Sequence, residues 1–524
     1  MLGSAFAAGP MTVLAGRRLG RIAPVRAGTY VGPILRLAPV PARSPHGTVP
    51  RSRRIGWWAL PARAAVGRCA RRALPERTVP AGHAGLLPPQ ARRHTVDVRR
   101  LNTCHVITRM IVGGAQENTL LTARGHIERG HRVVLVTGPS PGPEGALLAA
   151  ESVPGLEVVE VPSLVRQVSP RRDVQAYFEL KRLFRRERFD VVHTHSSKAG
   201  ILGRLAARSA GVPLVVHTVH GQAFHPYQSR LVNAAYILAE RLAARHCDRI
   251  LAVAQAMVDQ CVAARVAPAA MYRVVYSGMN MEAFLTARPD PELRRALGLP
   301  DGVPVVGKIA RLFELKGHSY LLDAAPRIVA AVPDVHFLLV GDGVLREQIA
   351  ARAAALGLAD RFIFAGLVPP ADVCRYTALM DVLVHLSLRE GLPRTVVQAL
   401  ASAVPAVGFA LDGTPEVIED GVTGRLCPTG DVGAVAEAVI GLLRDPVARQ
   451  RMGAAGRERV RNQFCWRRMA EIIEQEYSDG LRRRCSAGAA WPRSSSRSTA
   501  TACAAAVLLA PHGRDHRAGV QRRP

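Results

Sequence analysis

The acidic residue Glu390 is followed by a Gly-Leu-Pro turn and an apolar helical stretch in the segment REGLPRTVVQALASAVPAV, residues 389–407. It comes soon after the apolar run DVLVHLS, which is typical of a buried strand. Pro393 suits the first position of a helix, where a missing N–H is no loss. We therefore expect Glu390 at or just before a helix N-terminus, where backbone N–H groups carry partial positive charge. Such a carboxylate either caps the helix or binds a ligand, and the neighbouring segments must decide between the two.

Two cationic residues and several glycines follow other apolar runs. Arg311 and Lys316 lie five residues apart in GKIARLFELKGH, so both could face one polyanion, although two unrelated solvated charges would give the same pattern. The stretch DGTPEV leads into a second expected helix start, which is another candidate anion site. In the amino-terminal half, MIVGGAQENTLL places Gly113 and Gly114 in a turn between a strand-like segment and a helix.

Histidines cluster at expected strand ends. His193 and His195 end the run FDVVHTH, and this spacing could supply two metal ligands in a hydrolase barrel. Such a site needs further ligands from later strands of one barrel, whereas this chain predicts two separate sheets. His220 follows the run VPLVVHTV and precedes Gly221, a position where an imidazole can face a ligand as readily as it can be structural.

The elements that position these residues alternate regularly from about residue 101. Short apolar runs such as HRVVLVTG, DRILAVA, HFLLVGDG and RFIFAGLV are separated by amphipathic segments such as VLREQIAARAAALG. Continuous apolar runs suit parallel strands covered on both faces, and their alternation with helices predicts a doubly wound α/β architecture. We expect two such units, residues 101–285 and 286–465, and then a helix at 466–479. A cleft for ligands should lie between the carboxyl ends of their strands.

The charge of the chain belongs to its ends. The net charge is +29, yet the first 100 residues carry 18 basic against two acidic residues, and residues 480–524 carry nine against one. Residues 1–100 and 480–524 show no periodicity, so we interpret them as disordered basic tails; a misplaced start or shifted reading frame would look the same. A nucleic-acid partner is therefore not expected, and any such affinity should reside in these ends.

No run of the chain reaches the 18 to 20 or so apolar residues that span a bilayer. The opening MLGSAFAAGPMTVLAG lacks a basic residue ahead of its apolar run, so it makes a poor signal peptide. The nine cysteines show no paired short spacing and are interpreted as reduced thiols of a cytoplasmic protein. The segment YFELKRLFRRERF could present cations to anionic lipid, giving a possible peripheral membrane contact, although an ordinary solvated helix face explains it as well.

Taken in order, these motifs resemble the retaining glycosyltransferases of family four (group 1 type), which have the GT-B fold of two Rossmann-like domains facing a central cleft. The resemblance covers residues 101–478 and depends on the Gly113-Gly114 loop, His220, the Arg311 and Lys316 pair, and the later stretches GDG, EGLPRTVVQAL and DGTPEVI. The surroundings of the histidines are most similar to members that build surface polysaccharides.

The resemblance implies roles for individual residues. His220 and Glu390 would be catalytic, holding the donor sugar. Donor-binding roles would fall to ten others: Gly113, Gly114, Arg311, Lys316, Gly341, Gly343, Gly391, Leu392, Thr395 and Gln398. The family has a second glutamate where this chain has Gln398, which keeps a carbonyl acceptor for the ribose hydroxyls but loses the charge. Weaker donor affinity is expected from that change.

The implied reaction moves a hexosyl or N-acetylhexosaminyl group from a nucleoside-diphosphate donor to a saccharide or lipid-linked acceptor, in polysaccharide or glycolipid synthesis. No Asp-x-Asp motif accompanies it, so neither a metal nor another cofactor is expected. Two alternatives remain open at this point: a nucleotide-sugar 2-epimerase of the same fold, which needs no acceptor, and a non-catalytic subunit that only binds nucleotide sugars.

Overall fold

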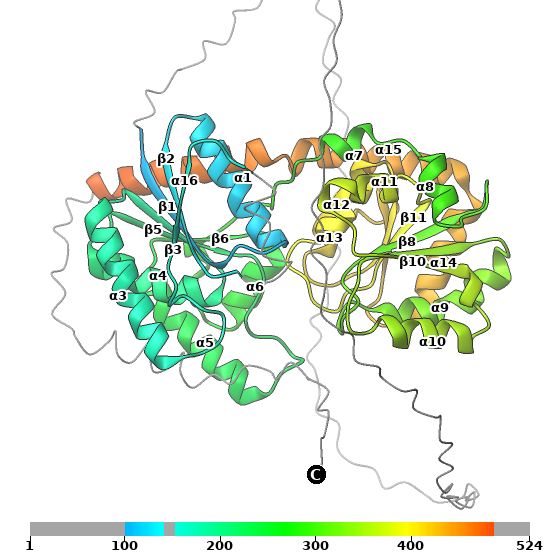
Figure 1. Ribbon diagram of the computed structural model, residues 1–524, viewed down its shortest axis with the longest axis horizontal. Coiled ribbons are helices and arrows are strands. Elements are labelled where there is room, and N and C mark those ends of the chain that lie inside the picture. Colours follow the sequence, from blue (N-terminus) through cyan, green and yellow to red (C-terminus); the bar gives the residue numbers. More distant parts are fainter. Residues whose placement is uncertain (1–99, 141–151, 487–524) are drawn as a thin grey trace, which may run out of the picture. The chain divides into compact units, whose positions relative to one another are not determined.

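The computed structural model describes residues 100–140 and 152–486. The two basic segments interpreted as tails lie outside these ranges, apart from Arg100 and residues 480–486. What is described consists of two parallel sheets with helices on both faces (Figure 1).

The first sheet has seven strands in the order β3-β2-β1-β4-β5-β6-β7, and all its pairings are parallel. Its apolar runs are buried on both faces, as in Val133 to Val136, where no residue exceeds 1% exposure. The chain order reverses between β1 and β4, and ligands of open α/β sheets bind at such a switch point. The strands are β1 (Asn102–Arg109), β2 (Arg132–Gly138), β3 (Leu156–Glu160), β4 (Val191–His195), β5 (Leu214–Val219), β6 (Arg249–Ala252) and β7 (Tyr272–Val274).

The helices of the first unit connect these strands by crossovers, because parallel strands cannot be joined by a hairpin. Gly211 ends α4 in the left-handed conformation, and the Ser229 side chain caps the start of α5 by accepting from the Val232 N–H. The helices are α1 (Gly114–Glu128), α3 (Pro170–Glu187), α4 (Ser197–Ala210), α5 (Arg230–Ala244) and α6 (Gln255–Ala263), with a short 3₁₀ turn at Ala269–Met271.

The second sheet has six parallel strands in the order β10-β9-β8-β11-β12-β13, so its switch point lies between β8 and β11. The segments that follow these two strands carry Arg311, Lys316 and Glu390. The fold therefore brings residues that are distant in sequence to one edge of the sheet. The strands are β8 (Val305–Ile309), β9 (His336–Val340), β10 (Phe362–Gly366), β11 (Val382–His385), β12 (Ala406–Phe409) and β13 (Gly424–Cys427).

Side-chain caps start several helices of the second unit. Asp290 accepts from the backbone N–H of Glu292 and Leu293, and Asp431 and Asp445 cap α14 and α15 in the same way. The helices are α7 (Glu282–Thr286), α8 (Pro291–Ala296), α9 (His318–Ala331), α10 (Arg346–Ala355), α11 (Val373–Thr377), α12 (Arg394–Ala401), α13 (Thr414–Val417), α14 (Val432–Arg444) and α15 (Pro446–Gln463), with 3₁₀ turns at Ala359–Arg361 and Pro370–Asp372.

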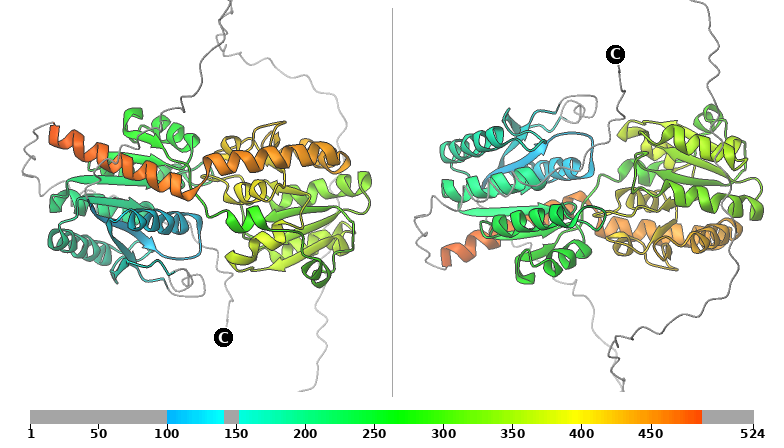
Figure 2. Two further views of the ribbon diagram at one scale, coloured as in Figure 1. Left: turned by 90° about the horizontal axis from the view of Figure 1, so that it is seen from above. Right: turned by 90° about the horizontal axis from the view of Figure 1, so that it is seen from below.

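The last helix, α16 (Trp466–Ser486), returns to the first unit and packs along α1 (Figure 2). It is longer than the helix expected at 466–479, so residues 480–486 are part of it rather than of a tail. Contacts to the first sheet explain the extension: the missing side chain of Gly480 leaves room for Leu214, and Arg484 donates to the carbonyl of Pro213.

The expected boundary between residues 285 and 286 falls inside α7. This helix contacts α11 and α12 of the second unit, and the Phe284 carbonyl accepts a hydrogen bond from Ser402 Oγ at 3.3 Å. Among the described residues, no helix is both long and apolar enough to cross a membrane.

Candidate active site

Residues from the strand ends of both units line one cavity of about 330 Å³. Eight of the twelve residues expected at the site are among those that line it: Gly114, His220, Arg311, Lys316, Glu390, Gly391, Leu392 and Thr395. Because these residues line one cavity, the structure decides between the two interpretations that the sequence left open for the charged residues, a shared ligand site or separate solvated charges. Arg311, Lys316 and Glu390 are not unrelated solvated charges.

The loop after β8 carries Arg311 and Lys316, and hydrogen bonds to its backbone hold it at the cavity. His318 hydrogen-bonds the carbonyl of Arg311 through Nε2 at 3.0 Å, and the Arg311 guanidinium lies 5.2 Å from the centre of the Phe313 ring. The backbone N–H of Leu388, just beyond β11, donates to the carbonyl of Leu315 at 2.8 Å. The loop that carries Arg311 and Lys316 is thereby held against the segment that carries Glu390.

Glu390 is ion-paired at the cavity wall. Its Oε1 lies 2.6 Å from Lys316 Nζ and 3.6 Å from His385 Nε2. Burial acts to raise the pKa of Glu390, but the charge of Lys316 and contacts with His385 and Ser387 outweigh it, so the pKa is below its usual range. The carboxylate is therefore charged at neutral pH.

The turn beside Glu390 does not place Pro393 inside the helix. Pro393 is the cap residue and α12 begins at Arg394, because the proline keeps an extended ψ of 92°. The Glu390 N–H instead donates to Asp412 Oδ2 at 2.8 Å. Asp412 belongs to the stretch expected to form a second anion site. The helix in this stretch, α13, has only four residues. Its Glu416 side chain accepts hydrogen bonds from the backbone N–H groups of Gln255 and Ala256 at the start of α6. That stretch joins the two units rather than forming an anion site of its own.

Across the cavity, His220 approaches the Glu390 turn closely. A side chain on Gly391 would overlap the His220 carbonyl oxygen, so only glycine allows this approach. Burial, with a contribution from the nearby charge of Arg394, lowers the pKa of His220 to about 3. The imidazole is therefore neutral at physiological pH.

The glycine loop of the first unit reaches the same cavity through Gly114, which lines it at the start of α1. The carbonyl of Gly114 accepts from Arg394 Nη1 at 3.4 Å, and Arg394 is also ion-paired with Glu117 in the first turn of α1. Gly113 precedes the helix as its cap residue but is not among the residues that line the cavity.

Three other expected donor-binding residues lie near the cavity without lining it. Gly341 has a positive φ of 129°, and a side chain there would overlap the Ala310 carbonyl, while one at Gly343 would meet the Phe313 ring. These glycines allow the segment after β9 to lie against the Arg311 loop. Gln398 is half-buried on α12, one turn beyond Thr395, and it too is absent from the cavity lining. Their contact with a donor remains a prediction.

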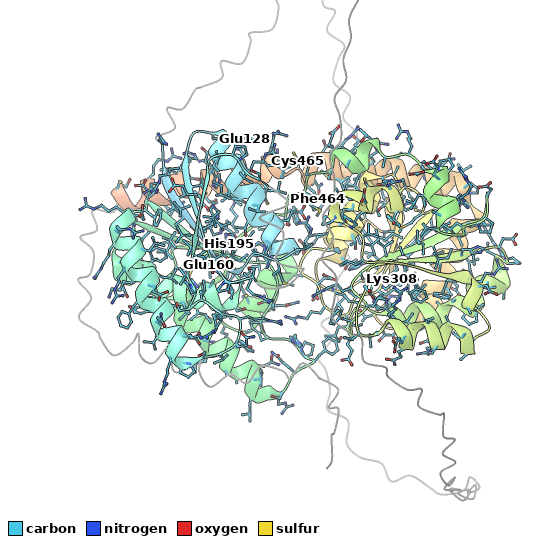
Figure 3. The ribbon with its side chains drawn as sticks, viewed as in Figure 1. Glu128, Glu160, His195, Lys308, Phe464 and Cys465 are labelled. Atoms are coloured by element: carbon cyan, nitrogen blue, oxygen red, sulfur yellow. The ribbon has the colours of Figure 1, made fainter. Side chains whose placement is uncertain are left out.

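Sequence reasoning missed several residues at or near the cavity, and three of them carry titratable or charged side chains. His385, at the end of β11, and Arg394 line it, and Lys308 on β8 is buried nearby (Figure 3). Burial and the charge of Lys316 lower the pKa of Lys308 to about 7, and burial lowers that of His385 to about 4. His385 was the one with a usable signal, because an imidazole at the end of an apolar run resembles the patterns at His195 and His220.

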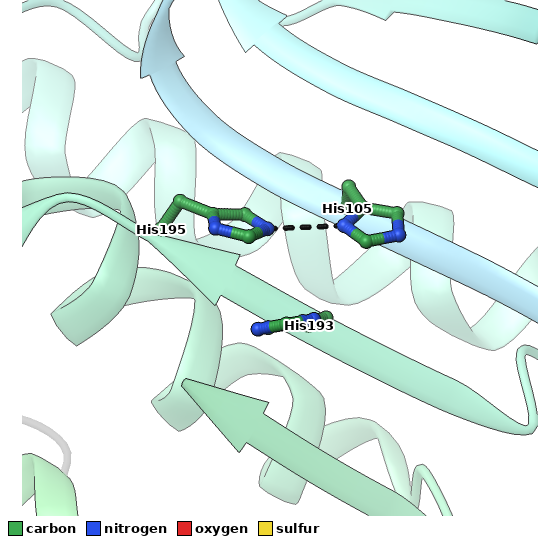
Figure 4. Close-up of side chains that lie close together, drawn as sticks. All are labelled: His105, His193 and His195. Carbon is green, nitrogen blue, oxygen red and sulfur yellow. Dashed lines mark hydrogen bonds between the residues drawn. The ribbon is translucent and has the colours of Figure 1, made fainter. Parts of the chain in front are cut away.

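His193 and His195 lie inside the first unit on β4, where His105 of β1 completes a group of three close imidazoles (Figure 4). Both ring nitrogens of His193 are hydrogen-bonded, to Tyr477 Oη and Thr218 Oγ1, each at 2.6 Å. Both nitrogens of His195 are bonded to other imidazoles. A metal ion at this group would have to replace these hydrogen bonds.

The site therefore offers two cations and a helix start on one side and a carboxylate and a neutral imidazole near them. Cations and backbone N–H groups suit a diphosphate, while a carboxylate and an imidazole suit the hydroxyls of a sugar. Two doubly wound units with such a cavity at their strand ends define a glycosyltransferase of the GT-B fold.

Comparison with known proteins supports this assignment to the glycosyltransferases. Residues 289–459 match the family model described as Glycosyl transferases group 1, and residues 113–278 match the Glycosyl transferase 4-like domain. The chain belongs to the group 1 glycosyltransferases, of the family-four type.

Two curated relatives illustrate the range of this family. The chain is 30% identical over 323 residues to the UDP-Gal:alpha-D-GlcNAc-diphosphoundecaprenol alpha-1,3-galactosyltransferase of Escherichia coli. This alignment covers 61% of this chain and 83% of the relative. It is 31% identical over 354 residues to the 2-deoxystreptamine N-acetyl-D-glucosaminyltransferase of Streptomyces fradiae, with 62% and 82% covered.

The crystal structure of Anabaena Alr3699/HepE in complex with UDP and glucose superimposes with a TM-score of 0.62 at 22% identity, covering 72% of this chain and all of that one. The sucrose-phosphate synthase of Thermosynechococcus elongatus gives a TM-score of 0.63 at 21% identity, with 72% and 99% covered. These two structures share the fold of this chain.

Proposed function

We propose that the protein is a retaining glycosyltransferase that moves a sugar from a nucleoside-diphosphate donor to a hydroxyl of a saccharide or lipid-linked acceptor. The observation that carries the proposal is the convergence of Arg311, Lys316 and Glu390 on one cavity with His220. The names of relatives support the substrate classes: one uses UDP-Gal and a diphosphoundecaprenol-linked sugar, and one structure contains UDP and glucose. We place the reaction in cell-surface polysaccharide or glycolipid biosynthesis.

The leaving group sets the first requirement. Transfer breaks the bond between the sugar's anomeric carbon and a phosphate oxygen, so negative charge grows on the departing nucleoside diphosphate. Arg311 and Lys316 stand where they can bind that charge, and the N–H groups at the start of α12 add a partial positive charge. In the free protein Lys316 is paired with Glu390, so donor phosphate would share the ammonium with that carboxylate.

The sugar sets the second requirement, since its ring carries growing positive charge as the bond breaks. The charged carboxylate of Glu390 stabilises this charge, and the neutral imidazole of His220 can hydrogen-bond the sugar without adding an opposing charge. The acceptor oxygen then bonds the anomeric carbon on the face that the phosphate left. Its proton passes to the departing phosphate oxygen, so the anomeric configuration is retained without a protein nucleophile.

We propose that this reaction needs no metal, because the protein's own cations bind the diphosphate. Transfer should persist at an undiminished rate in excess EDTA. A loss that added Mg²⁺ or Mn²⁺ reverses would contradict this part of the proposal.

The acceptor would enter from the first unit. A second cavity of about 280 Å³ shares His220 and Ala115 with the donor cavity and is otherwise lined by first-unit residues, including Arg204, Glu240 and Gln222. A lipid-linked acceptor would place the enzyme at the cytoplasmic face of the membrane, where α3 exposes Val174 and Phe178 among its basic residues. Sedimentation of the protein with anionic vesicles, but not with neutral ones, tests that placement.

The test of the proposal uses the full chain with a panel of UDP- and GDP-sugars and saccharide acceptors, with products analysed by NMR. We expect transfer to an acceptor with an unchanged anomeric configuration. His220→Ala and Glu390→Ala should abolish it, whereas Glu437→Ala, which removes a highly exposed glutamate of the same unit, should not. Epimerised sugar nucleotide without acceptor, or inverted product, would contradict the proposal.

A further inference from the structure

A chain of hydrogen-bonded imidazoles runs from the donor cavity into the first unit. His220 Nε2 lies 3.0 Å from His195 Nδ1, and His195 Nε2 lies 3.0 Å from His105 Nδ1 (Figure 4 shows the inner link). His195 and His105 are fully buried at the switch point between β4 and β1, so water does not compete for these bonds. Only His220 reaches the cavity.

The three rings are neutral. Burial lowers the pKa of His105 and His220 to about 3 and that of His195 well below its usual range. A neutral imidazole carries one N–H, so each ring can donate through one nitrogen and must accept through the other. In both links an Nδ1 faces an Nε2. The three rings must therefore share one tautomer, either all Nδ1–H or all Nε2–H.

The inner end of the chain selects between these arrangements. His105 Nε2 is buried and has no hydrogen-bond partner. The nearby His126 donates through its own Nε2 to the Ala470 carbonyl at 3.2 Å, and no hydrogen bond joins it to His105. An all-Nε2–H chain would leave an unpaired N–H at His105, whereas an all-Nδ1–H chain leaves only a bare lone pair. Orphaned buried donors are the rarer and costlier case.

We propose that His195 and His105 are positioning residues that hold His220 in its Nδ1–H tautomer, so that it presents a neutral hydrogen-bond donor to the sugar. The proposal rests on the function proposed above and extends it to two residues that do not reach the cavity. Nδ1 is the ring nitrogen of His220 that lies outside the chain. Without the chain, His220 would exchange between tautomers and spend part of its time with an acceptor at that position.

Two substitutions of His195 separate this role from simple packing. In His195→Asn the amide nitrogen can occupy the place of Nδ1 and still donate to His220 Nε2. In His195→Gln the amide extends toward the place of Nε2, so it keeps the contact with His105 and loses the one with His220. Both replacements are polar and smaller than or similar to histidine, so the pair is matched for burial.

The experiment is a two-bond ¹H–¹⁵N correlation spectrum of the full chain with ¹⁵N-labelled histidine, with the His220 signals assigned from a His220→Gln variant. We expect the Nδ1–H pattern for His105, His195 and His220 in the native protein. His195→Asn should keep this pattern at His220 and most of the activity. His195→Gln should lose it and lower kcat about tenfold, the worth of one hydrogen bond, while the circular dichroism stays unchanged.

An Nε2–H or mixed pattern at His220 in the native protein would overturn the proposal, and so would equal kinetics for the two variants. Since the spectrum is recorded without donor, it does not depend on the reaction. An Nδ1–H pattern in a protein that transfers no sugar would support the tautomer assignment and refute the proposed function.

Discussion

Replacing Lys316 by methionine tests the charge arrangement of the cavity most fully. The change removes the ammonium that lies 2.6 Å from Glu390 Oε1 and keeps most of the aliphatic stem. Removing one partner of a fully buried ion pair costs about 3–5 kcal/mol, because the other charge is left without compensation. Here the side chains of Lys316 and Glu390 keep 26% and 18% of their exposure, so water compensates in part and we expect about 2 kcal/mol.

For a unit of this size, about 2 kcal/mol corresponds to a fall in Tm of about 4–8 °C. The pH dependence has a defined sign. In the native protein the pKa of Glu390 is below its usual range, so its ionised form stabilises the fold at neutral pH and this contribution is lost on acidification. In the variant burial acts without the ammonium and raises the pKa of Glu390. The difference in stability between the two proteins should therefore be largest at neutral pH and shrink as the pH falls below about 5.

Activity and stability should separate in the double variant Lys316→Met/Glu390→Gln. The neutral amide leaves no unpaired charge, so the Tm should recover part of its loss. The kcat/KM, about 10²–10³-fold low in the single variant because the diphosphate has lost a cation, should fall further in the double variant because the sugar has also lost the Glu390 carboxylate. Arg327→Met is the matched control, since it breaks an exposed pair with Glu437 and should cost less than about 1 kcal/mol. A Lys316→Met protein as stable as that control, or a double variant less stable than the single one, would refute the reasoning.

Three further predictions concern the same site. Gly391→Ala should lower kcat/KM at least tenfold in steady-state assays, because its side chain would overlap the His220 carbonyl, whereas Gly441→Ala, where nothing lies within 4 Å, should have no effect; equal rates would contradict this. Gln398→Glu should lower the KM for the donor about fivefold, since a charged acceptor hydrogen-bonds the ribose more strongly, and an unchanged or higher KM would place Gln398 away from the nucleoside. Because burial holds the pKa of His105, His126 and His220 at about 3, the unfolded state takes up protons below pH 6.5 and the folded state does not. The free energy of unfolding should therefore fall from pH 7 to pH 5 by up to about 1.4 kcal/mol per pH unit for each ring, and Tm should fall with it; a constant Tm would show that these rings titrate normally.

The fold was predictable because its signals are local and repeated. Runs such as Val133 to Val136 are long enough to be buried on both faces, and they alternate with helices, which leaves few arrangements other than two doubly wound sheets. The ends of elements were less predictable. Nothing in the local pattern shows that Gly480 would pack against Leu214, and this distant contact is what extends α16 to Ser486.

The candidate site was predictable where a motif carries the residue and less so where only the tertiary fold does. Arg311, Lys316 and Glu390 belong to motifs, and parallel strands bring their ends to one edge. Arg394 appeared to be an ordinary helix residue until its contacts with Gly114 and Glu117 were visible. No sequence pattern marked His105 as important. Its role depends on its hydrogen bond with His195 on the neighbouring strand, and the sequence of a single strand does not show which strand lies beside it.

The central claim is that the donor's diphosphate binds between the cations of the second unit and the glycine loop and histidine of the first. A crystal structure of the full chain soaked with UDP or GDP tests it most directly. We predict diphosphate oxygens within hydrogen-bond distance of Arg311 and Lys316, in the cavity that His220 and Gly114 line. A nucleotide bound elsewhere, with Lys316 still paired to Glu390 and the cavity empty, would contradict the account.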